Sequence, residues 1–166
     1  MSQTTDDLKA AFAGESQANR RYLAFAKKAE EEGHPQIAKM FRAIAAAETV
    51  HALNHFRTLD GVKSTAENLQ AAIAGEHYEV NTMYPDFIKD AEADNDRKAK
   101  NSFNWALEAE KGHEVLYTQA LANLGKEASQ LDYYVCPICG YTHEGNAAPG
   151  KCPVCGTPGS RFEIFK

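Results

Sequence analysis

Residues 41–51 read FRAIAAAETVH, and this stretch decides the fold because a glutamate and a histidine continue an apolar helical face. Phe41 and Ile44 follow helical spacing, and the same face runs on through Glu48 and His51. Residues three apart share a helix face, so this carboxylate and this imidazole can bind one metal ion. A single Glu-x-x-His motif is common on helices and indicates little by itself.

The motif has a second copy. Glu110 and His113 repeat it at an offset of 62 residues, and two further glutamates in apolar stripes, Glu15 and Glu76, match at an offset of 61. Tyr22 with Tyr84 and Phe41 with Phe103 also match at 62. Two helix hairpins related by a pseudo-two-fold axis would place such residues around one centre.

The apolar spacing predicts four helices, at residues 5–32, 36–59, 66–93 and 96–125. Thr4 or Thr5 is expected to cap the first helix, and Pro85 to kink the third. The segment 60–67 then crosses over between the second and third helices. The predicted fold class is an all-α four-helix bundle of the ferritin-like type.

The four stripe glutamates predict a metal centre. A buried, unpaired carboxylate is so unfavourable that it needs a proton, a partner or a cation. One Glu from each of two helices, with Glu-x-x-His from each of the other two, is the ligand set of di-iron bundles. Carboxylates with one imidazole per metal suit iron or manganese. Bridging by Glu48 and Glu110 would hold two ions close enough to act together on an O–O bond.

Other residues near these stripes have open interpretations. Glu79 lies three residues after Glu76, but its repeat position is Ala18, so it is either a further ligand or a solvated flank residue. Tyr22 and Tyr84 are either hydrogen-bond partners of ligand carboxylates or core tyrosines. His55 is expected in the core or behind the ligands, and the remaining histidines, at positions 34, 77 and 143, on the surface.

Composition excludes several function classes. The 166 residues are 43% hydrophobic and 25% charged, as in ordinary globular proteins. A net charge of −5 argues against nucleic-acid binding. There is no apolar run long enough for a transmembrane helix, and residues 1–12, MSQTTDDLKAAF, do not have the pattern of a signal peptide. We therefore expect a cytoplasmic protein that does not enter a membrane.

The C-terminal residues differ in composition from the rest. Two metal knuckles contain all the cysteines, Cys136, Cys139, Cys152 and Cys155, each pair separated by two residues and followed by glycine. This predicts a tetrahedral four-thiolate site for zinc or iron, because both metals accept four sulfurs. A catalytic di-iron centre needs an electron source, which favours iron, a one-electron carrier in such a site. The predicted domains are 1–131, the helical bundle, and 132–166, the four-cysteine domain.

Taken together, these motifs resemble the rubrerythrin family over nearly the whole chain. The resemblance is carried by FAGESQANRRY (12–22), FRAIAAAETVH (41–51), GEHYEVNTMYP (75–85), AEKGHE (109–114), CPICGY (136–141) and CPVCG (152–156). It implies a ferritin-like di-iron domain followed by a rubredoxin-like domain. It also implies Tyr22 and Tyr84 as hydrogen-bonding tyrosines next to the metal centre.

The resemblance further implies which residues bind each iron. The ligands of the first are Glu15, Glu48, Glu79, Glu110 and His51, and those of the second are Glu76, Glu48, Glu110 and His113. In the family the first iron moves between a histidine and a glutamate as its oxidation state changes. Here these would be His51 when reduced and Glu79 when oxidised, which makes both residues catalytic.

The activity implied is two-electron reduction of hydrogen peroxide to water in oxidative-stress defence. Electrons would come from rubredoxin or an NAD(P)H-dependent reductase and pass through the four-cysteine iron, although zinc can replace iron in such sites. The expected assembly is a homodimer, and some members of the family exchange helix pairs between subunits.

Two other functions fit parts of the sequence. A ferroxidase of the ferritin type would use Fe(II) as substrate and need no attached electron carrier, so the four-cysteine domain argues against it. A helical scaffold with a structural zinc ribbon would bind partners without catalysis. Visible absorption separates the latter, because ferric tetrathiolate sites are red and zinc sites are colourless.

Overall fold

The computed structural model describes residues 2–126 and 130–166, and the chain falls into two compact units. The first unit extends through Lys63 and the second begins at Ser64. The segment 59–64 connects them, and the crossover expected there stays a prediction. No helix among the described residues is both long and apolar enough to cross a bilayer.

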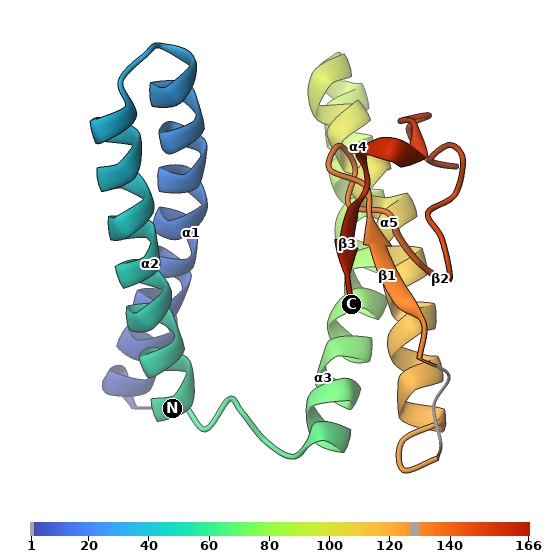
Figure 1. Ribbon diagram of the computed structural model, residues 1–166. Coiled ribbons are helices and arrows are strands. Elements are labelled where there is room, and N and C mark those ends of the chain that lie inside the picture. The colour runs from blue at the N-terminus through green and yellow to red at the C-terminus, as the bar shows by residue number, and fades with distance from the viewer. Residues whose placement is uncertain (1, 127–129) are drawn as a thin grey trace. The chain divides into compact units, whose positions relative to one another are not determined.

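The first unit is a hairpin of two antiparallel helices, α1 (Gln3–Glu31) and α2 (Pro35–Thr58) (Figure 1). Their contact is lined by alanines, which let the two backbones approach closely: Ala18, Ala26, Ala29, Ala38, Ala45 and Ala52. Asn19 joins the helices directly, because its amide donates to the Ala45 carbonyl at 2.6 Å and to the Thr49 hydroxyl at 2.8 Å.

The cap of α1 differs from the prediction. Ser2, not Thr4 or Thr5, is the N-cap, and its hydroxyl accepts from the Thr5 N–H at 3.3 Å. The helix therefore begins two residues earlier than apolar spacing indicates. The other end agrees with the prediction, since Gly33 has φ of 80° and Pro35 starts α2.

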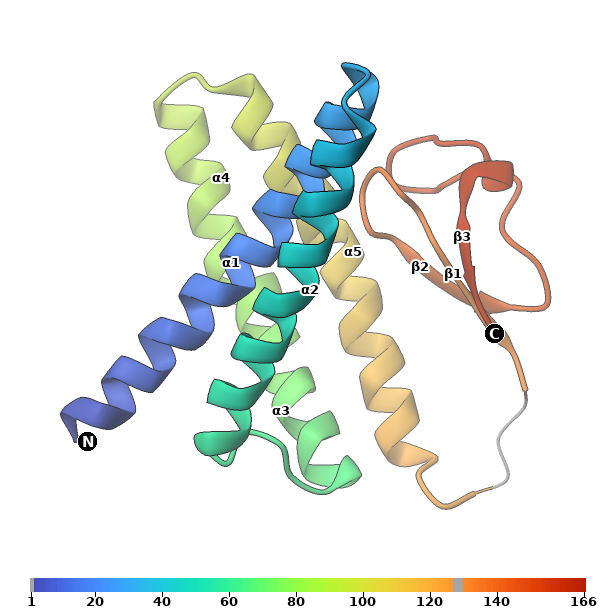
Figure 2. The same cartoon turned by 60° about the vertical axis from the view of Figure 1, so that its left-hand side comes forward.

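The second unit contains the third and fourth predicted helices. The third is continuous from residue 65 to 93 but has three parts: α3 (Thr65–Tyr78), a π-helical turn η1 (Glu79–Met83) and α4 (Tyr84–Ala93). The fourth is α5 (Arg97–Ala122), which runs antiparallel to α4 (Figure 2). Ser64 begins α3 with a reciprocal capping box to Glu67, and Asp96 caps α5.

The π-helical turn widens the helix directly before Pro85. Within it the Tyr84 N–H bonds to the Glu79 carbonyl, five residues back. Pro85 lies in the first turn of α4, and its missing N–H can be tolerated at the point where the hydrogen-bonding pattern changes. The helix is thus interrupted slightly before the expected position.

An aromatic triad occurs in each hairpin at matching positions. In the first, Tyr22, Phe25 and Phe41 lie with ring centroids 5.7–6.2 Å apart. In the second, Tyr84, Phe87 and Phe103 lie 5.5–6.4 Å apart. The repeat in the sequence is therefore a repeat in packing, with one aromatic cluster holding each pair of helices together.

After α5 the chain forms a small antiparallel sheet. Its strands are β1 (Asp132–Val135), β2 (Thr142–Gly145) and β3 (Glu163–Phe165), in the order β2-β1-β3. The core beside the sheet is made by Tyr134 and Phe162 together with the buried cysteines Cys136 and Cys152. A hydrophobic core this small needs a further stabilising cross-link, and the four cysteines supply the ligands for a metal ion that provides it.

Candidate metal centres

The first hairpin brings three predicted ligands together. Glu15 on α1 and Glu48 and His51 on α2 offer ligand atoms that all lie within 4.8 Å of one another. His51 Nδ1 is 2.9 Å from Glu48 Oε2 and 3.9 Å from Glu15 Oε1. The Glu48 side chain is half-buried within its own hairpin, with 15% exposed.

The second hairpin builds the matching cluster. Glu76 on α3 and Glu110 and His113 on α5 again have ligand atoms within 4.8 Å of one another. His113 Nδ1 lies 2.5 Å from Glu110 Oε2. Each hairpin therefore provides two carboxylates and one imidazole at equivalent positions, as the offsets predict.

Glu76 shows most clearly that the second cluster needs a cation. Its Oε2 atom is buried and has no hydrogen-bond partner among the described residues. Burial, followed by the hydrogen bond and charge repulsion from Glu110, raises the pKa of Glu76 to about 7. Two adjacent carboxylates with a free buried oxygen are unstable without positive charge. A metal ion would satisfy this oxygen, so the residues present fit a metal centre.

His113 and Glu110 shift each other's pKa in the sense expected of an ion pair. The hydrogen bond to Glu110 raises the pKa of His113, although burial opposes this. The bond to His113 lowers the pKa of Glu110. A cation can replace the proton on Nδ1 between these two groups, because both then present lone pairs to the same ion.

Glu79 lies outside the three-residue cluster but within its electric field. Burial, and then the negative charge of Glu110, raise the pKa of the Glu79 carboxyl. Glu79 is also the first residue of the π-helical turn. Such turns occur frequently at functional sites because the extra residue redirects a side chain.

Tyr84 lies close to the same carboxylates. Burial, followed by the charges of Glu79, Glu110 and Glu76, raises the pKa of its phenol, which therefore stays protonated at neutral pH. In the part of the chain that the structure describes, neither Tyr84 nor Tyr22 makes a hydrogen bond to a ligand carboxylate. Their roles remain predictions.

The other histidines are not in these clusters. His55 is half-buried on α2, and His34 is exposed. His77, predicted on the surface, is exposed there and pairs with Glu114 at 2.8 Å. His143 is half-buried, with its ring against Tyr134.

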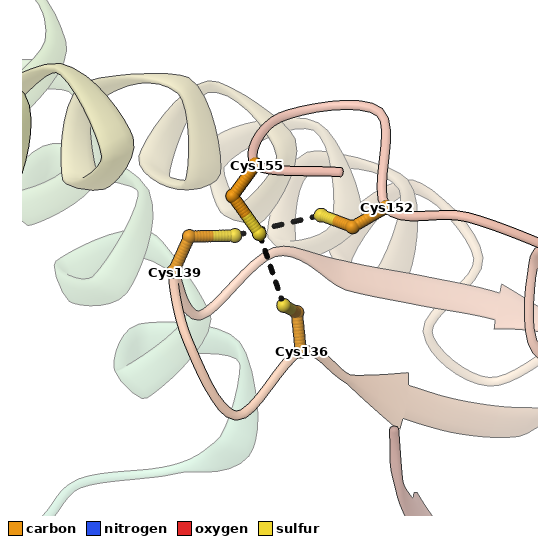
Figure 3. Close-up of side chains that lie close together, drawn as sticks. All are labelled: Cys136, Cys139, Cys152 and Cys155. Carbon is orange, nitrogen blue, oxygen red and sulfur yellow. Dashed lines mark hydrogen bonds between the residues drawn. The ribbon is translucent and has the colours of Figure 1, made fainter. Parts of the chain in front are cut away.

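The four cysteines converge on one point between two loops of the C-terminal domain (Figure 3). Cys136 Sγ lies 3.5 Å from Cys155 Sγ, and Cys139 Sγ lies 3.5 Å from Cys152 Sγ. All four are free thiols. Sulfurs brought together in this way without disulfides form a tetrathiolate metal site.

The two knuckles have the same backbone design. Gly140 has φ of 79° and Gly156 of 80°, as the glycine after each CxxC pair predicts. Each glycine N–H bonds back to the carbonyl of the first cysteine, Cys136 or Cys152, at 3.0 Å. The knuckles are therefore preformed, and glycine is needed where the chain turns left-handed.

The thiols have unequal proton affinities. Burial raises the pKa of Cys139, while the Tyr141 N–H lowers it. At Cys155 burial also raises the pKa, but the hydroxyl and N–H of Thr157 and the neighbouring thiols outweigh it and lower the pKa to about 6. Cys155 therefore ionises readily, and a metal ion bound there would draw the other thiols into the deprotonated state.

Two threonines at these centres were not predicted from the sequence. Thr157 lies 3.1 Å from Cys155 Sγ through its hydroxyl. Its position after Gly156, directly beyond the knuckle, was the available signal. Thr142 on β2 lies 3.0 Å from His113 Nε2 on α5. Nothing in the local sequence pairs these two residues, which are distant along the chain.

Two Glu–Glu–His clusters on repeated helix hairpins, with a four-thiolate cluster in the same chain, define a ferritin-like di-iron protein that carries a rubredoxin-like domain. Comparison with known families gives the same answer: the rubrerythrin family model matches residues 6–121 and the model of the rubrerythrin rubredoxin-like domain matches residues 134–163. The chain belongs to the rubrerythrin family.

Characterised relatives match over nearly their full length. Rubrerythrin-2 of Clostridium acetobutylicum is 36% identical over 98% of this chain and 96% of the relative. Nigerythrin of Nitratidesulfovibrio vulgaris is 37% identical over 98% of this chain and 86% of the relative. The structure of nigerythrin in its fully reduced, all-ferrous state is 35% identical and has a TM-score of 0.60, with 99% of this chain and 88% of that chain covered.

These matches confirm the predicted fold class and the cofactors, a di-iron centre and a four-cysteine iron centre. The predicted domain boundary near Asp132 lies between the two matched segments and stays a prediction, as does the assignment of individual ligands.

Proposed function

We propose that this protein is a hydrogen peroxide reductase that takes its electrons through its own four-cysteine iron. The reaction is H2O2 + 2 H+ + 2 e− → 2 H2O. The observation that carries the proposal is the presence, in one chain, of two carboxylate–imidazole clusters and a four-thiolate cluster. An iron-storage protein does not need an attached one-electron carrier, whereas a catalytic cycle that consumes two electrons does.

We assign the helical metal ligands from the two Glu–Glu–His clusters. Glu15, Glu48 and His51 from the first hairpin and Glu76, Glu110 and His113 from the second would hold the two irons. Glu48 and Glu110 would serve both irons, and Glu79 would be an additional ligand. Cys136, Cys139, Cys152 and Cys155 hold the third iron. When bound, the iron pair supplies two electrons to the O–O bond and the thiolate iron supplies single electrons.

In this proposal the protein's own side chains orient the metal ligands and hold protons near the metal centre. Glu110 and His113 fix each other at 2.5 Å, so both ligands are positioned before a cation binds. The Tyr84 phenol is protonated at neutral pH, and its raised pKa keeps that proton in place at alkaline pH as well. We propose that it donates a hydrogen bond to an oxygen atom beside Glu79. The raised pKa of Glu76, about 7, lets that carboxyl hold a proton when the positive charge near it is low.

His51 and Glu79 differ from the other ligands in a way that suits alternating use. His51 Nδ1 lies 2.9 Å from Glu48 Oε2, a looser contact than the 2.5 Å between His113 Nδ1 and Glu110 Oε2 in the second cluster. Glu79 lies outside the three-residue cluster, at the start of the π-helical turn. We assign His51 to the reduced state and Glu79 to the oxidised state.

The electron donor in this proposal is rubredoxin or an NAD(P)H-dependent reductase, and the assembly is a homodimer, with or without exchange of helix pairs. Four free thiols suit a reducing compartment, so we place the protein in the cytoplasm. The net charge of −5 disfavours nucleic acid as a partner.

Substrate choice tests the proposal. The iron-loaded, fully reduced protein is mixed rapidly with either peroxide or dioxygen at equal concentration, and the return of the red ferric tetrathiolate absorption is followed. We expect peroxide to reoxidise the protein at least about tenfold faster than dioxygen does, because the two electrons of the iron pair complete the reduction of peroxide to water. Faster reaction with dioxygen would favour a ferroxidase instead.

A separate prediction concerns Glu79. Glu79→Ala should leave the protein folded and both three-residue clusters loaded, but slow turnover with peroxide by roughly tenfold because the oxidised state loses a ligand. The control is Glu108→Ala, which removes an exposed carboxylate on α5 that pairs with Lys111 on the same helix. Unchanged turnover in Glu79→Ala would remove Glu79 from the mechanism.

A further inference from the structure

A short hydrogen-bonded chain connects the C-terminal domain to a predicted iron ligand. His113 Nε2 on α5 lies 3.0 Å from the Thr142 hydroxyl and 3.3 Å from the Gly140 carbonyl. The Thr142 hydroxyl in turn donates to the Gly140 carbonyl at 3.1 Å. All three residues belong to the second unit and are half-buried.

The number of protons in this chain decides which nitrogen of His113 carries hydrogen. A hydroxyl has one proton, and Thr142 uses it on the Gly140 carbonyl. It can therefore only accept from His113, and the Gly140 carbonyl can also only accept. Nε2 must then carry a hydrogen, so the nitrogen that can give up its proton to a cation is Nδ1, which shares that proton with Glu110.

We propose that Thr142 is a positioning residue for the helical metal centre: its hydroxyl holds the Nε2–H of His113 and so presents Nδ1 to the metal. A histidine ligand is oriented by the group that accepts its other N–H. Here that group comes from β2, two residues after the glycine that closes the first cysteine knuckle. The orientation of a di-iron ligand thus depends on the folding of the four-cysteine domain.

The surroundings explain why a side-chain hydroxyl matters here. A cavity of about 400 Å³ borders the pair and is lined by His113, Thr142, Tyr117, Tyr133 and apolar side chains of α3 and α5. It is large enough to admit water. Without the hydroxyl, water can compete for the Nε2–H, and only the longer contact to the Gly140 carbonyl remains.

The proposal rests on the metal centre of the proposed function but not on its substrate, so the test uses zinc and no peroxide. The full chain is labelled with 15N-histidine and loaded with zinc at all sites. Long-range 1H–15N spectra identify the nitrogen that carries hydrogen, and exchange of that hydrogen with water is measured. His113→Gln identifies the signal.

We expect the His113 Nε2–H to exchange slowly in the wild type and within about twofold of that rate in Thr142→Ser, which retains the hydroxyl. In Thr142→Val, which has nearly the same shape, exchange should be about tenfold faster, as expected for the loss of one hydrogen bond. Thr118→Val is the control, because that hydroxyl donates to the Glu114 carbonyl on the same helix.

Exchange within about twofold of wild type in Thr142→Val would overturn the proposal. The red absorption of an iron-loaded sample of each variant shows whether the four-cysteine domain is intact. If the valine variant lost this absorption, Thr142→Ala would decide by the same criterion. The peroxide assay is independent, so failure of the peroxidase proposal would leave this result unchanged.

Discussion

Glu110→Ala is expected to empty the helical metal centre while the four-thiolate site stays loaded. Glu110 contacts His113 and lies beside Glu76, and its side chain is 18% exposed. Its removal leaves one carboxylate and one imidazole in the second cluster and takes away a ligand that we propose serves both irons. Because metal catalysis contributes several kcal/mol, peroxide turnover should fall roughly a thousandfold. Metal analysis and peroxide consumption measure the two effects.

The matched control for this variant is Glu114→Ala. Glu114 lies four residues further along α5 and pairs with His77 rather than with a predicted ligand. Its removal should leave metal content and turnover within about twofold of wild type, since exposed ion pairs contribute little. A Glu110→Ala protein with full metal content and full turnover would contradict the ligand assignment.

Cys139→Ser is expected to separate the two metal centres functionally. Cys139 Sγ lies 3.5 Å from Cys152 Sγ inside the four-thiolate cluster, and a serine hydroxyl is a much poorer ligand for iron than a thiolate. The red absorption should disappear and NADH-supported turnover should drop to background. The helical centre should still react once with peroxide, because its ligands lie on the helices.

The measurement is steady-state NADH oxidation with a reductase, followed by a single-turnover reaction of the chemically reduced protein. Ser160→Ala is the control, since Ser160 is an exposed residue of the short turn Gly159–Arg161 in the same domain and is not part of the cysteine cluster. Full NADH-supported activity in Cys139→Ser would exclude the electron relay through the cysteines.

Much of this architecture could be predicted from the sequence because the ligands come from local patterns. Glu48 and His51 are three residues apart on one helix, and the constant offset to Glu110 and His113 indicates a repeated hairpin. Helical geometry alone then places each imidazole next to its carboxylate, at 2.9 Å and 2.5 Å. The cysteine knuckles are equally local, because two residues between thiols and a following glycine determine their shape.

The π-helical turn explains a change in the repeat offset that is visible in the sequence. The offset is 61 residues at Glu15 and Glu76 but 62 at Tyr22 and Tyr84, so one residue is inserted between these positions in the second hairpin. The structure accommodates it as η1, which begins at Glu79. The turn that takes up the inserted residue therefore begins at Glu79, the predicted ligand that lies outside the two symmetric clusters.

Neither the contacts between distant residues nor the choice among several possible N-cap residues could be predicted from local sequence patterns. The contact between His113 and Thr142 joins α5 to β2 and depends on how the two elements pack. At the N-terminus Ser2, Thr4 and Thr5 are all good capping residues, and apolar periodicity does not decide among them. The structure selects Ser2 because the helix extends to Gln3.

The central claim is that this chain holds an iron pair among its helical glutamates and histidines and one further iron among its cysteines. Mössbauer spectroscopy of the oxidised, 57Fe-loaded protein tests it most directly, because it distinguishes coupled from isolated iron. The account predicts two signals in a ratio of about two to one, from a spin-coupled diferric pair and a ferric tetrathiolate site. A tetrathiolate signal alone, in a protein saturated with iron, would contradict it.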